Sequence, residues 1–374
     1  MLSSNKLRFI GGGRWAQIVL AEVLKLNPKI DIDWVTNHSL ISQNSIKDFL
    51  RFEKNIKIFK SDDFHKLNNP SKVIIASNSI NHCRDLLVHK YSVETLIEKP
   101  LFPDLKSFLC LTEIEKKCIF FNLEFYNAFF IIDFCAQINL QKIITLEVEW
   151  HDPFVELRPN GETKYSEVFS SIFMDQLLHV MSILKVMKID SSKLKNIDIN
   201  LKKKNSNGEI IIISESNNFQ LRISLSRFSS KRIRKITVNN GQISLDFSSK
   251  PILNKNGNFI QEFHSKNRLF PIAKTLEGFL IPSNKSSIKN LSLKSLEPEI
   301  QFCFNCESLY TKIYKSRFPV LINKFDPFLA YFAGIHYYQK YSNQKKIKSN
   351  FYLKGDQGLA ELEKWWENYK IQFN

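Results

Sequence analysis

Three consecutive glycines near the N-terminus stand between an apolar stretch and a segment of helical periodicity. Lys6 to Ile10 is typical of a buried strand, and Trp15 to Leu26 repeats its apolar residues with the spacing of a helix. Glycines between a strand and a helix allow a tight turn that residues with a side chain rarely make. We therefore expect a strand–turn–helix unit at the start of the chain.

The alternation of apolar stretches and helical patterns continues to about residue 122. Further strands are expected at Ile30 to Val35, Ile56 to Phe59, Lys72 to Ala76, Val93 to Ile97 and Ile119 to Phe121. Helical patterns lie between them at Ser45 to Phe52, Asn81 to His89 and Leu105 to Lys117. Strands that alternate with helices form right-handed βαβ units and a parallel sheet. The fold class predicted for residues 1–122 is an α/β Rossmann domain with a doubly wound parallel sheet.

Beyond Asn122 the pattern changes to longer strands joined by hairpin turns. After a helical segment, Ala128 to Gln137, strands are expected at Ile143 to Trp150, Leu194 to Leu201, Glu209 to Glu215, Gln220 to Ser226, Arg232 to Val238 and Gln242 to Phe247. One helical stretch, Glu167 to Met187, interrupts them. Residues 123–318 are thus expected to form a substrate-binding α/β domain with a mostly antiparallel open sheet. Residues 319–374 are expected to form a helical C-terminal extension.

Charge and hydropathy exclude several classes of protein. The net charge is +16, but the lysines are scattered along the chain, so we expect no nucleic-acid partner and attribute the charge to attraction of a phosphate-bearing substrate or cofactor. No apolar stretch is long enough to span a bilayer. The first apolar stretch runs into glycines and not into a signal cleavage site. These features predict a cytoplasmic protein without a membrane partner.

The six cysteines do not indicate a disulfide framework or a metal site. Most of them stand in apolar surroundings in a long chain. Cys303 and Cys306 form a Cys-x-x-Cys pair, but a zinc site needs two further ligands, and none is nearby. The pair also lies in a segment with a helical pattern. We expect no metal.

The glycine turn matches the pattern G-x-G-x-x-A of dinucleotide-binding sites. The matched residues are Gly11, Gly12, Gly13, Arg14, Trp15 and Ala16. In this pattern the first glycine makes the turn, the second lets the backbone approach a pyrophosphate, and the small third residue lets helix and strand pack closely. The helix N-terminus offers N–H groups and a partial positive charge to the phosphates. The motif opens a βαβ series, so we expect bound NAD or NADP.

The end of the second strand bears on the choice between the two cofactors. An acidic residue there usually bonds the ribose hydroxyls of NAD. In this chain the tip, around Thr36, Asn37 and His38, is neutral. A neutral tip leaves room for a 2′-phosphate and favours NADP, while Asn37 could equally serve NAD through neutral hydrogen bonds.

Two later segments resemble the Gfo/Idh/MocA family of oxidoreductases. One runs from Ile74 through Ser77, Asn78 and His82 to the Glu98-Lys99-Pro100 sequence after the next strand, and the other is Phe173 to His179, with a D-x-x-x-H pattern. The resemblance covers roughly residues 5 to 315. It implies that the cofactor contacts Ser77, Asn78, His82, Glu98, Lys99 and Pro100. Glycines of the family's second motif are replaced here by Ser170, Ser171 and Leu177.

Physical arguments single out three residues for chemistry. Lys99 follows an apolar strand, so it lies at the carboxyl edge of the sheet, where ligands bind in open α/β folds. Asp175 and His179 are four residues apart and share a face of an otherwise apolar helix. Burying ionisable groups there is costly unless they bond each other or face a cavity. We expect Lys99 to stabilise charge, His179 to move a proton, and Asp175 to support His179, all three serving one substrate in the cleft between the domains.

The function predicted from these observations is hydride transfer between NAD(P) and a carbonyl or alcohol carbon, with a sugar, sugar nucleotide or cyclitol implied by the resemblance. Two alternatives remain open: an imine reductase of the thiazolinyl imide type and a non-catalytic nicotinamide-binding regulator. Retention of both Lys99 and His179 speaks against the regulator. Tyr126, Trp150 and Tyr165 are candidate substrate contacts, as are other loop residues, namely His151, Asp152, Arg158 and Lys164. A homo-oligomer through the open sheet of the second domain is also expected.

Overall fold

The computed structural model describes most of the chain up to residue 317. The described residues are 6–36, 55–60, 67, 70–77, 82–87, 93–99, 108–153, 155–157, 163–165, 171–204, 207–216, 219–226, 229–265, 268–284 and 286–317. The chain divides into two compact units. Unit 1 is Met1–Ile132 with Ser265–Gln301, and unit 2 is Asp133–His264 with Phe302–Asn374.

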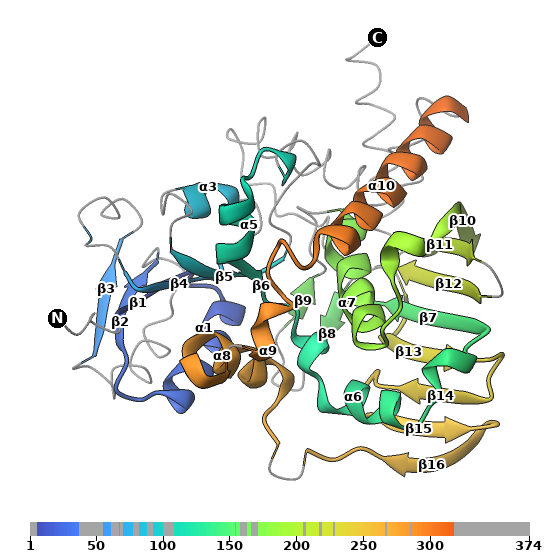
Figure 1. Ribbon diagram of the computed structural model, residues 1–374, viewed down its shortest axis with the longest axis horizontal. Helices are drawn as coiled ribbons and strands as arrows, with labels where there is room; N and C mark the ends of the chain where they lie inside the picture. Colours follow the sequence, from blue (N-terminus) through green and yellow to red (C-terminus); the bar gives the residue numbers. More distant parts are fainter. Residues whose placement is uncertain are drawn as a thin grey trace. The chain divides into compact units, whose positions relative to one another are not determined.

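A parallel sheet of six strands forms the centre of unit 1. Its order is β3 (Ile56–Phe59), β2 (Asp31–Val35), β1 (Lys6–Ile10), β4 (Lys72–Ile75), β5 (Glu94–Ile97) and β6 (Ile119–Phe121), and every neighbouring pair is parallel (Figure 1). The order reverses between β1 and β4, which is the switch point of a doubly wound sheet. The Rossmann fold predicted from the alternating pattern is confirmed.

Helices cover the described part of this sheet. They are α1 (Arg14–Leu26), α3 (His82–Leu87), α5 (Glu113–Cys118), the 3₁₀ turn η4 (Glu124–Asn127), α8 (Pro271–Leu280), η8 (Pro282–Asn284) and α9 (Ser286–Lys289). The buried face of α1 consists of Ala16, Val19, Leu20, Val23 and Leu24. Figure 1 shows α8 beside α1, and the two helices are in contact.

The segment Ser265–Gln301 belongs to unit 1 because it packs on that sheet. Lys72 of β4 donates a hydrogen bond to the carbonyl of Phe279 in α8. Phe121 N donates to Leu291 O at 2.9 Å, and Leu293 N donates to Ile119 O at 2.8 Å, so the chain after α9 runs along β6. This segment lies in unit 1 and not in the second domain, where the domain bounds 123–318 predicted it, because its return to the first sheet depends on packing that is not visible along the chain.

One expected helix is interrupted. The pattern over Leu105 to Lys117 predicts a continuous helix, but within the described residues a turn at Cys110 and Leu111 separates Phe108 and Leu109 from α5. The reason is the capping box of α5. The Thr112 hydroxyl accepts from Glu115 N at 3.3 Å, and the Glu115 carboxylate accepts from Thr112 N at 2.6 Å. This pair satisfies the first N–H groups of a new helix, which therefore begins after Thr112.

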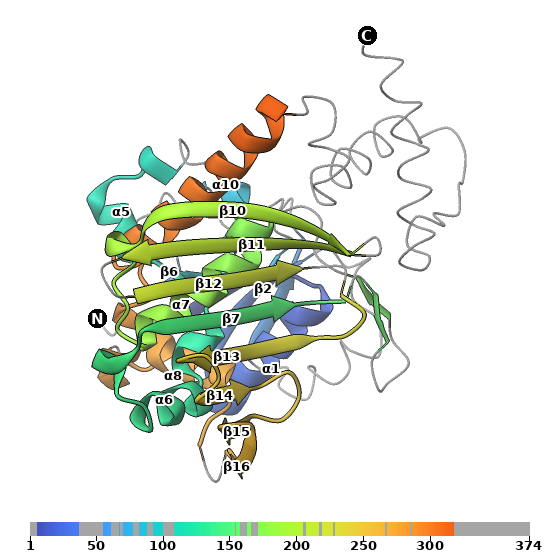
Figure 2. The ribbon, with the colours of Figure 1, turned by 90° about the vertical axis from the view of Figure 1, so that its right-hand side faces the viewer.

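Unit 2 contains a mixed sheet of eight strands. Its order is β10 (Lys195–Lys204), β11 (Asn207–Ser216), β12 (Phe219–Ser226), β7 (Thr145–His151), β13 (Ile233–Val238), β14 (Ile243–Asp246), β15 (Ile252–Lys255) and β16 (Asn258–Glu262) (Figure 2). All neighbours are antiparallel except β12 and β7, which are parallel. The mostly antiparallel sheet is confirmed, and β15 and β16 extend it beyond the strands predicted from the sequence.

The core of unit 2 lies between one face of this sheet and a helix. That helix has a π-helical turn, Phe173–Leu177, followed directly by α7 (Leu178–Val186). Figures 1 and 2 show α7 against the sheet. Residues of β7 alternate, with Leu146, Val148 and Trp150 buried on the helix side. The remaining elements are α6 (Phe129–Ala136), η5 (Leu140–Lys142), the hairpin of β8 (Val155–Leu157) and β9 (Thr163–Tyr165), η7 (Ser191–Lys193) and α10 (Glu297–Arg317).

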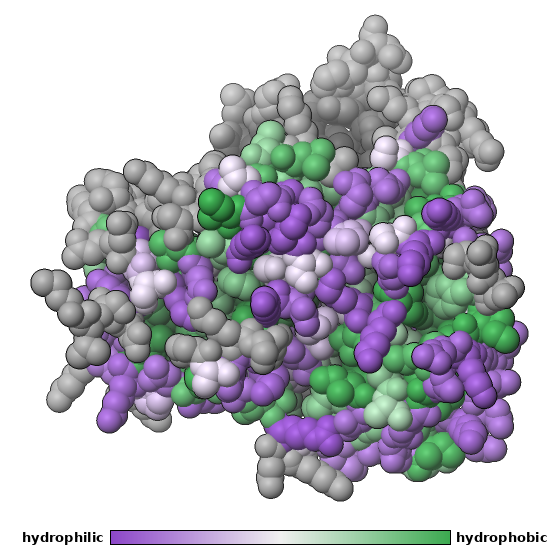
Figure 3. Space-filling model, viewed as in Figure 1, coloured by the Kyte–Doolittle hydropathy of each residue, from purple (hydrophilic) through white to green (hydrophobic). Residues whose placement is uncertain are grey.

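Hydropathy and cysteine placement agree with a globular chain. On the face seen in Figure 3, hydrophilic and hydrophobic residues are interspersed and no large apolar field stands out. None of the described helices is both long and apolar enough to cross a bilayer. Cys303 and Cys306 are free thiols buried in α10, as the helical pattern predicted.

Candidate active site

The turn after β1 is built so that only glycine fits its first position. Gly11 has φ +132°, and a Cβ there would lie 2.5 Å from the carbonyl oxygen of Ala76, at the end of β4. Gly11 N donates to Val35 O at 3.0 Å, and the indole Nε1 of Trp34 donates to Gly11 O at 2.7 Å. The tight turn predicted from the glycines is therefore held by two hydrogen bonds with β2 and packs closely against Ala76, which follows β4.

The second motif glycine is open. Gly13 caps α1 with ordinary extended angles, φ −67° and ψ 168°, and a Cβ built there would meet no atom of the described residues within 4 Å. Gly12 O accepts a hydrogen bond from Gln17 Nε2 at 3.1 Å, and Ala16 is fully buried. Arg14 begins α1. The space above Gly13 faces the N-terminus of α1, whose first N–H groups attract anions. The turn fits a dinucleotide pyrophosphate.

The residue after β2 places a polar side chain at the carboxyl edge of the sheet, where the glycine turn also lies. Thr36 follows β2 and is 3% exposed, and its hydroxyl oxygen has no hydrogen-bond partner within the part of the chain that the structure describes. A buried hydroxyl without a partner is costly unless a ligand or water completes it. This position is where a dinucleotide's ribose would bind. Asn37, Asn78 and Pro100, also predicted to hold the cofactor, lie outside the described residues.

Two residues predicted to contact the cofactor, Ser77 after β4 and His82 in α3, are joined by a polar contact. Ser77 Oγ donates to Asp85 Oδ2 at 2.6 Å, and His82 Nε2 lies 3.0 Å from Ser77 O. His82 is 1% exposed, so its ring is enclosed at the start of α3. Since a carbonyl only accepts, His82 carries a proton on Nε2. These bonds tie Ser77, after β4, to α3.

Glu98 joins the glycine turn to the ends of β5 and β6. Its carboxylate accepts from Trp15 Nε1 at 2.7 Å and from Asn122 Nδ2. Lys99, the predicted charge-stabilising residue, follows it directly and is half-buried. Burial raises the pKa of Glu98 to about 7, and this effect outweighs the hydrogen bonds and the charge of Lys99, which lower it. The Glu98 carboxyl can therefore change its protonation near neutral pH.

We expect Glu98→Gln to remove a pH dependence of stability. The pKa of Glu98 is raised from 4.5 to about 7, so the folded state holds this proton more tightly than the unfolded chain does. The stability from this group is therefore present below about pH 4.5 and is lost as the pH rises through about 7. Glutamine is never ionised and still accepts from Trp15. The variant should exceed wild type by about 1–2 kcal/mol at pH 8, after allowance for partial exposure, and match it at about pH 5.

The measurement is urea unfolding of the cofactor-free protein across this pH range. Glu113→Gln serves as a control whose effect on stability should have the opposite sign, because a hydrogen bond from Lys294 lowers the pKa of Glu113. That variant should lose stability relative to wild type above the usual pKa of glutamate. A Glu98→Gln effect that is constant from pH 5 to 8 would show that this carboxyl does not titrate as described.

In unit 2 the residues of the D-x-x-x-H pattern are enclosed against the sheet. Asp175 lies in the π-helical turn and His179 in α7, and each is 8% exposed. The ring of His179 stacks on Trp150 of β7, with ring centroids 5.2 Å apart and planes at 18°. Ser171 Oγ accepts from Met174 N at 3.2 Å and thus caps this helix where the family has glycine. π-Helical turns inside helices occur frequently at functional sites.

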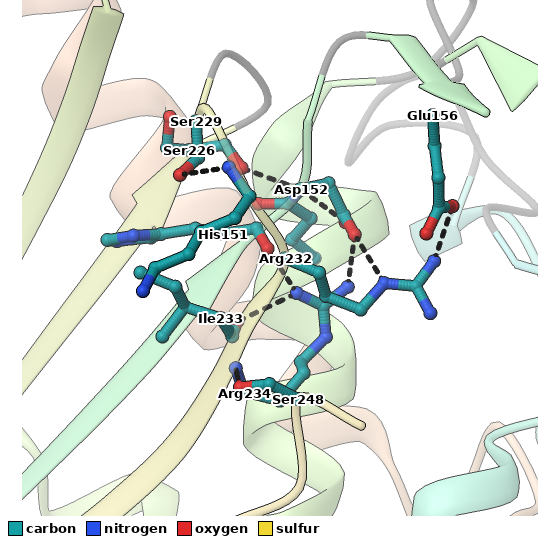
Figure 4. Close-up of polar contacts among 11 residues, drawn as sticks. His151, Asp152, Glu156, Ser226, Ser229, Arg232, Ile233, Arg234 and Ser248 are labelled. Carbon is teal, nitrogen blue, oxygen red and sulfur yellow. Dashed lines mark hydrogen bonds and ion pairs between the residues drawn. The ribbon is translucent and has the colours of Figure 1, made fainter.

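Asp152, directly after β7, contacts several polar side chains near this helix (Figure 4). Its carboxylate pairs with Arg234 Nη2 at 2.5 Å and lies 3.8 Å from Arg232 Nε. Its second oxygen accepts from Gln176 Nε2 at 2.9 Å. Arg232 also pairs with Glu156 at 2.7 Å. These contacts make Asp152 a structural link between the sheet and the π-helical turn.

Several residues of this arrangement were not singled out from the sequence. Arg234 occupies an inward position of β13, in phase with Ile236 and Val238, and a charge in the apolar phase of a strand is a signal that could have found it. Asn122 follows β6 as Glu98 follows β5, which is the same edge of the sheet. Gln176 gave no sequence signal.

The remaining predicted substrate contacts have the following places. The Tyr126 hydroxyl accepts from Asn290 Nδ2 at 2.8 Å in unit 1. Trp150 is 2% exposed and lies under His179. Tyr165 ends β9, opposite Val155 of β8, and Arg158 lies outside the described residues. Within the described residues, no three His, Cys, Asp or Glu side chains gather to hold a metal ion.

Comparison with known proteins adds to this geometry. No protein-family model and no curated protein matches the sequence. A Gfo/Idh/MocA family oxidoreductase from Vibrio cholerae has a similar structure, with a TM-score of 0.57 over 83% of this chain and 100% of that one at 13% identity. This chain has the Gfo/Idh/MocA oxidoreductase fold.

Two further structures share the Gfo/Idh/MocA-type fold of this chain. A UDP-N-acetylglucosamine 3-dehydrogenase from Acidithiobacillus ferrooxidans gives a TM-score of 0.57 over 79% of this chain and 95% of that one, at 14% identity. A biliverdin reductase from Synechocystis, in complex with biliverdin and NADP⁺, gives 0.59 over 82% and 98%, at 14% identity. The resemblance predicted from the two sequence segments thus extends to the fold of both units.

Proposed function

We propose that this protein is an NAD(P)-dependent oxidoreductase that transfers hydride to or from a carbonyl or alcohol carbon of a sugar nucleotide. The observation that carries the proposal is the carboxyl edge of the parallel sheet. Separate strands of one sheet end there at three features: Gly13 with its open side, the Thr36 hydroxyl, which has no partner among the described residues, and the consecutive residues Glu98 and Lys99. This edge is where open α/β sheets bind ligands.

The bound nicotinamide would accept or supply the hydride, and residues of the chain would bind the substrate and move the proton. Gly11 to Ala16 would bind the pyrophosphate at the N-terminus of α1. Lys99 would hold the substrate oxygen and offset the negative charge that develops on it. His179 would take or give the proton of that oxygen, since an unperturbed imidazole titrates near neutrality. Asp175 would support His179 from the preceding turn.

The sugar nucleotide class is proposed from two supports. The net charge of +16 suits a substrate that carries phosphates. One protein of the same fold is a UDP-N-acetylglucosamine 3-dehydrogenase. A sugar nucleotide has secondary hydroxyls on carbons that can lose hydride. In such a reaction a lysine can stabilise the charge on the oxygen and a histidine can move its proton.

Turnover with defined substrates tests the proposal. The purified protein is incubated with NADP⁺ or NAD⁺ and UDP-N-acetylglucosamine, and the absorbance of the reduced nicotinamide is followed. Other UDP-hexoses and free N-acetylglucosamine are run beside it. Formation of reduced cofactor with a UDP-sugar and not with the free sugar supports the proposal. Binding of cofactor without turnover of any sugar nucleotide would refute the substrate class and favour the regulator or imine alternatives.

NADPH should bind at least as tightly as NADH, because the tip of β2 is neutral. A carboxylate there would repel a 2′-phosphate, so we expect Asn37→Asp to weaken NADPH binding by about tenfold or more while NADH binding changes less. Fluorescence titration of both cofactors gives the two dissociation constants. Asn37→Gln, which stays neutral, is the matched control. A wild-type preference for NADH of more than tenfold would show that the tip does not select NADP.

A further inference from the structure

Trp150 lies between the sheet and the residue proposed to move the proton. It is 2% exposed on β7, on the face that α7 covers. Its indole contacts two polar groups: the ring of His179, with centroids 5.2 Å apart and planes at 18°, and the guanidinium of Arg234, whose Cζ lies 3.9 Å from the ring centroid. A purely apolar core position would not gather a cation and an imidazole on one indole.

Arg234 is fixed in this position by hydrogen bonds at several of its donors. Nη1 donates to His151 O at 2.7 Å and to Ile233 O at 2.9 Å, and Nη2 pairs with Asp152 at 2.5 Å (Figure 4). In the sheet register, Arg234 stands directly opposite Trp150. A guanidinium held on an aromatic face by cation–π attraction stabilises the ring in one orientation. The indole therefore has little freedom to turn.

The helix that carries His179 is tied to the same carboxylate. Gln176 Nε2 donates to Asp152 Oδ2 at 2.9 Å and to Ser226 O at 3.1 Å. These bonds set the position of the π-helical turn along the sheet, three residues before His179. Asp152 thus bonds both the arginine that contacts the indole and the helix that carries His179, so the indole and the imidazole are tied to the same carboxylate.

We propose that Trp150 is a positioning residue that fixes the plane of the His179 imidazole, and that the Arg234–Asp152 pair holds the indole for this purpose. The consequence for catalysis rests on the proposed function, whereas the orientation of the ring does not. A proton relay must keep its nitrogen within hydrogen-bond reach of the reacting oxygen. Fixing the ring plane satisfies that need before substrate binds.

The first experiment reads the ring orientation without substrate. The protein, with its eight histidines labelled with ¹³C and ¹⁵N, is studied by NMR, and the His179 signals are identified by their loss in His179→Gln. Stacking on an indole shifts the ring protons of an imidazole upfield. We expect this shift in wild type, a smaller one in Trp150→Phe, and none in Trp150→Leu.

Val148→Ala is the matched control. Val148 lies on the same strand and the same buried face, two residues before Trp150, so this variant loses core packing without touching the stack. Its His179 shift should equal that of wild type even though its melting temperature falls. Trp150→Phe keeps a flat ring, so it remains informative if Trp150→Leu does not fold.

The second experiment measures turnover of the sugar nucleotide. Trp150→Leu should lower kcat by roughly 100-fold, the effect of a displaced catalytic group, with KM and NADPH affinity unchanged. Trp150→Phe should restore most of the rate, and Val148→Ala should retain it. An upfield shift that persists in Trp150→Leu, or a lost shift with normal kcat, overturns the proposal. If wild type turns over no sugar nucleotide, the proposed function fails, while the NMR result still decides whether Trp150 orients His179.

Discussion

Replacing His179 by alanine is expected to lower kcat by roughly 100-fold or more, the usual effect of removing a proton-transfer group. Among the described residues, the imidazole is one of few ionisable groups buried between the helix and the sheet of unit 2. It stacks on the indole of Trp150. Alanine keeps the helix but removes the relay. NADPH affinity should stay unchanged, because the cofactor would bind to residues of unit 1. Stopped-flow measurement of hydride transfer, together with fluorescence titration of NADPH, separates the two effects.

His264→Ala is the control for this prediction. His264 belongs to the same unit, but its side chain is exposed and lies 3.6 Å from Glu262 at the surface. Its loss should leave turnover and binding as in wild type. Lys99→Ala should show a loss comparable to that of His179→Ala, because the two residues are proposed to act on one oxygen. Full activity of a folded His179→Ala protein would remove His179 from the mechanism.

The sequence predicted the fold well where the signal was local. β1, β3 and β6 have the predicted bounds, because each is a short strand-like run that ends before a glycine, a lysine or an asparagine. The alternating pattern of unit 1 permits few topologies, since βαβ connections are right-handed. The parallel, doubly wound sheet followed from it, whereas the order of its strands was not predicted.

What the sequence did not reveal depends on contacts between distant residues. The hairpin of β15 and β16 turns at Asn256 and Gly257, both with positive φ, but its strands are too short to stand out from the surrounding loop pattern. The return of α8 to unit 1 is set by its packing on α1, which no local pattern encodes. The capping box of Thr112 and Glu115 is a local signal for the start of α5, but the longer helical pattern of Leu105 to Lys117 concealed it.

The candidate site shows the same division. Gly11, Gly13 and Lys99 were predicted as site residues because turn chemistry and strand ends are visible in the sequence. The spacing of Asp175 and His179 predicted one helix face, but the π-helical turn that holds Asp175 could not be derived from that spacing. Asp152 was predicted only as a candidate substrate contact at the end of a strand. Its role as the link between Arg234 and Gln176 requires three segments that meet only after folding.

Gly13→Val is expected to abolish tight cofactor binding while the protein stays folded. The backbone of Gly13 has angles that valine adopts, and within the part of the chain that the structure describes its Cβ would meet no atom within 4 Å, so the free energy of unfolding should change little. The added side chain would instead fill the space through which a pyrophosphate reaches the N-terminus of α1. Losing one or two charge-assisted hydrogen bonds there should raise the NADPH dissociation constant by roughly 100-fold.

Gly11→Ala separates folding from binding at the same turn. Its Cβ would lie 2.5 Å from the backbone oxygen of Ala76 at φ +132°, so the strand ends must move apart. We expect a loss of about 2–5 kcal/mol in the free energy of unfolding, from backbone strain and overpacking together. The two variants are compared by thermal unfolding and by NADPH titration. A folded Gly13→Val protein that binds NADPH as tightly as wild type would mean that the cofactor does not approach this turn, because no other effect of that side chain is expected in the protein.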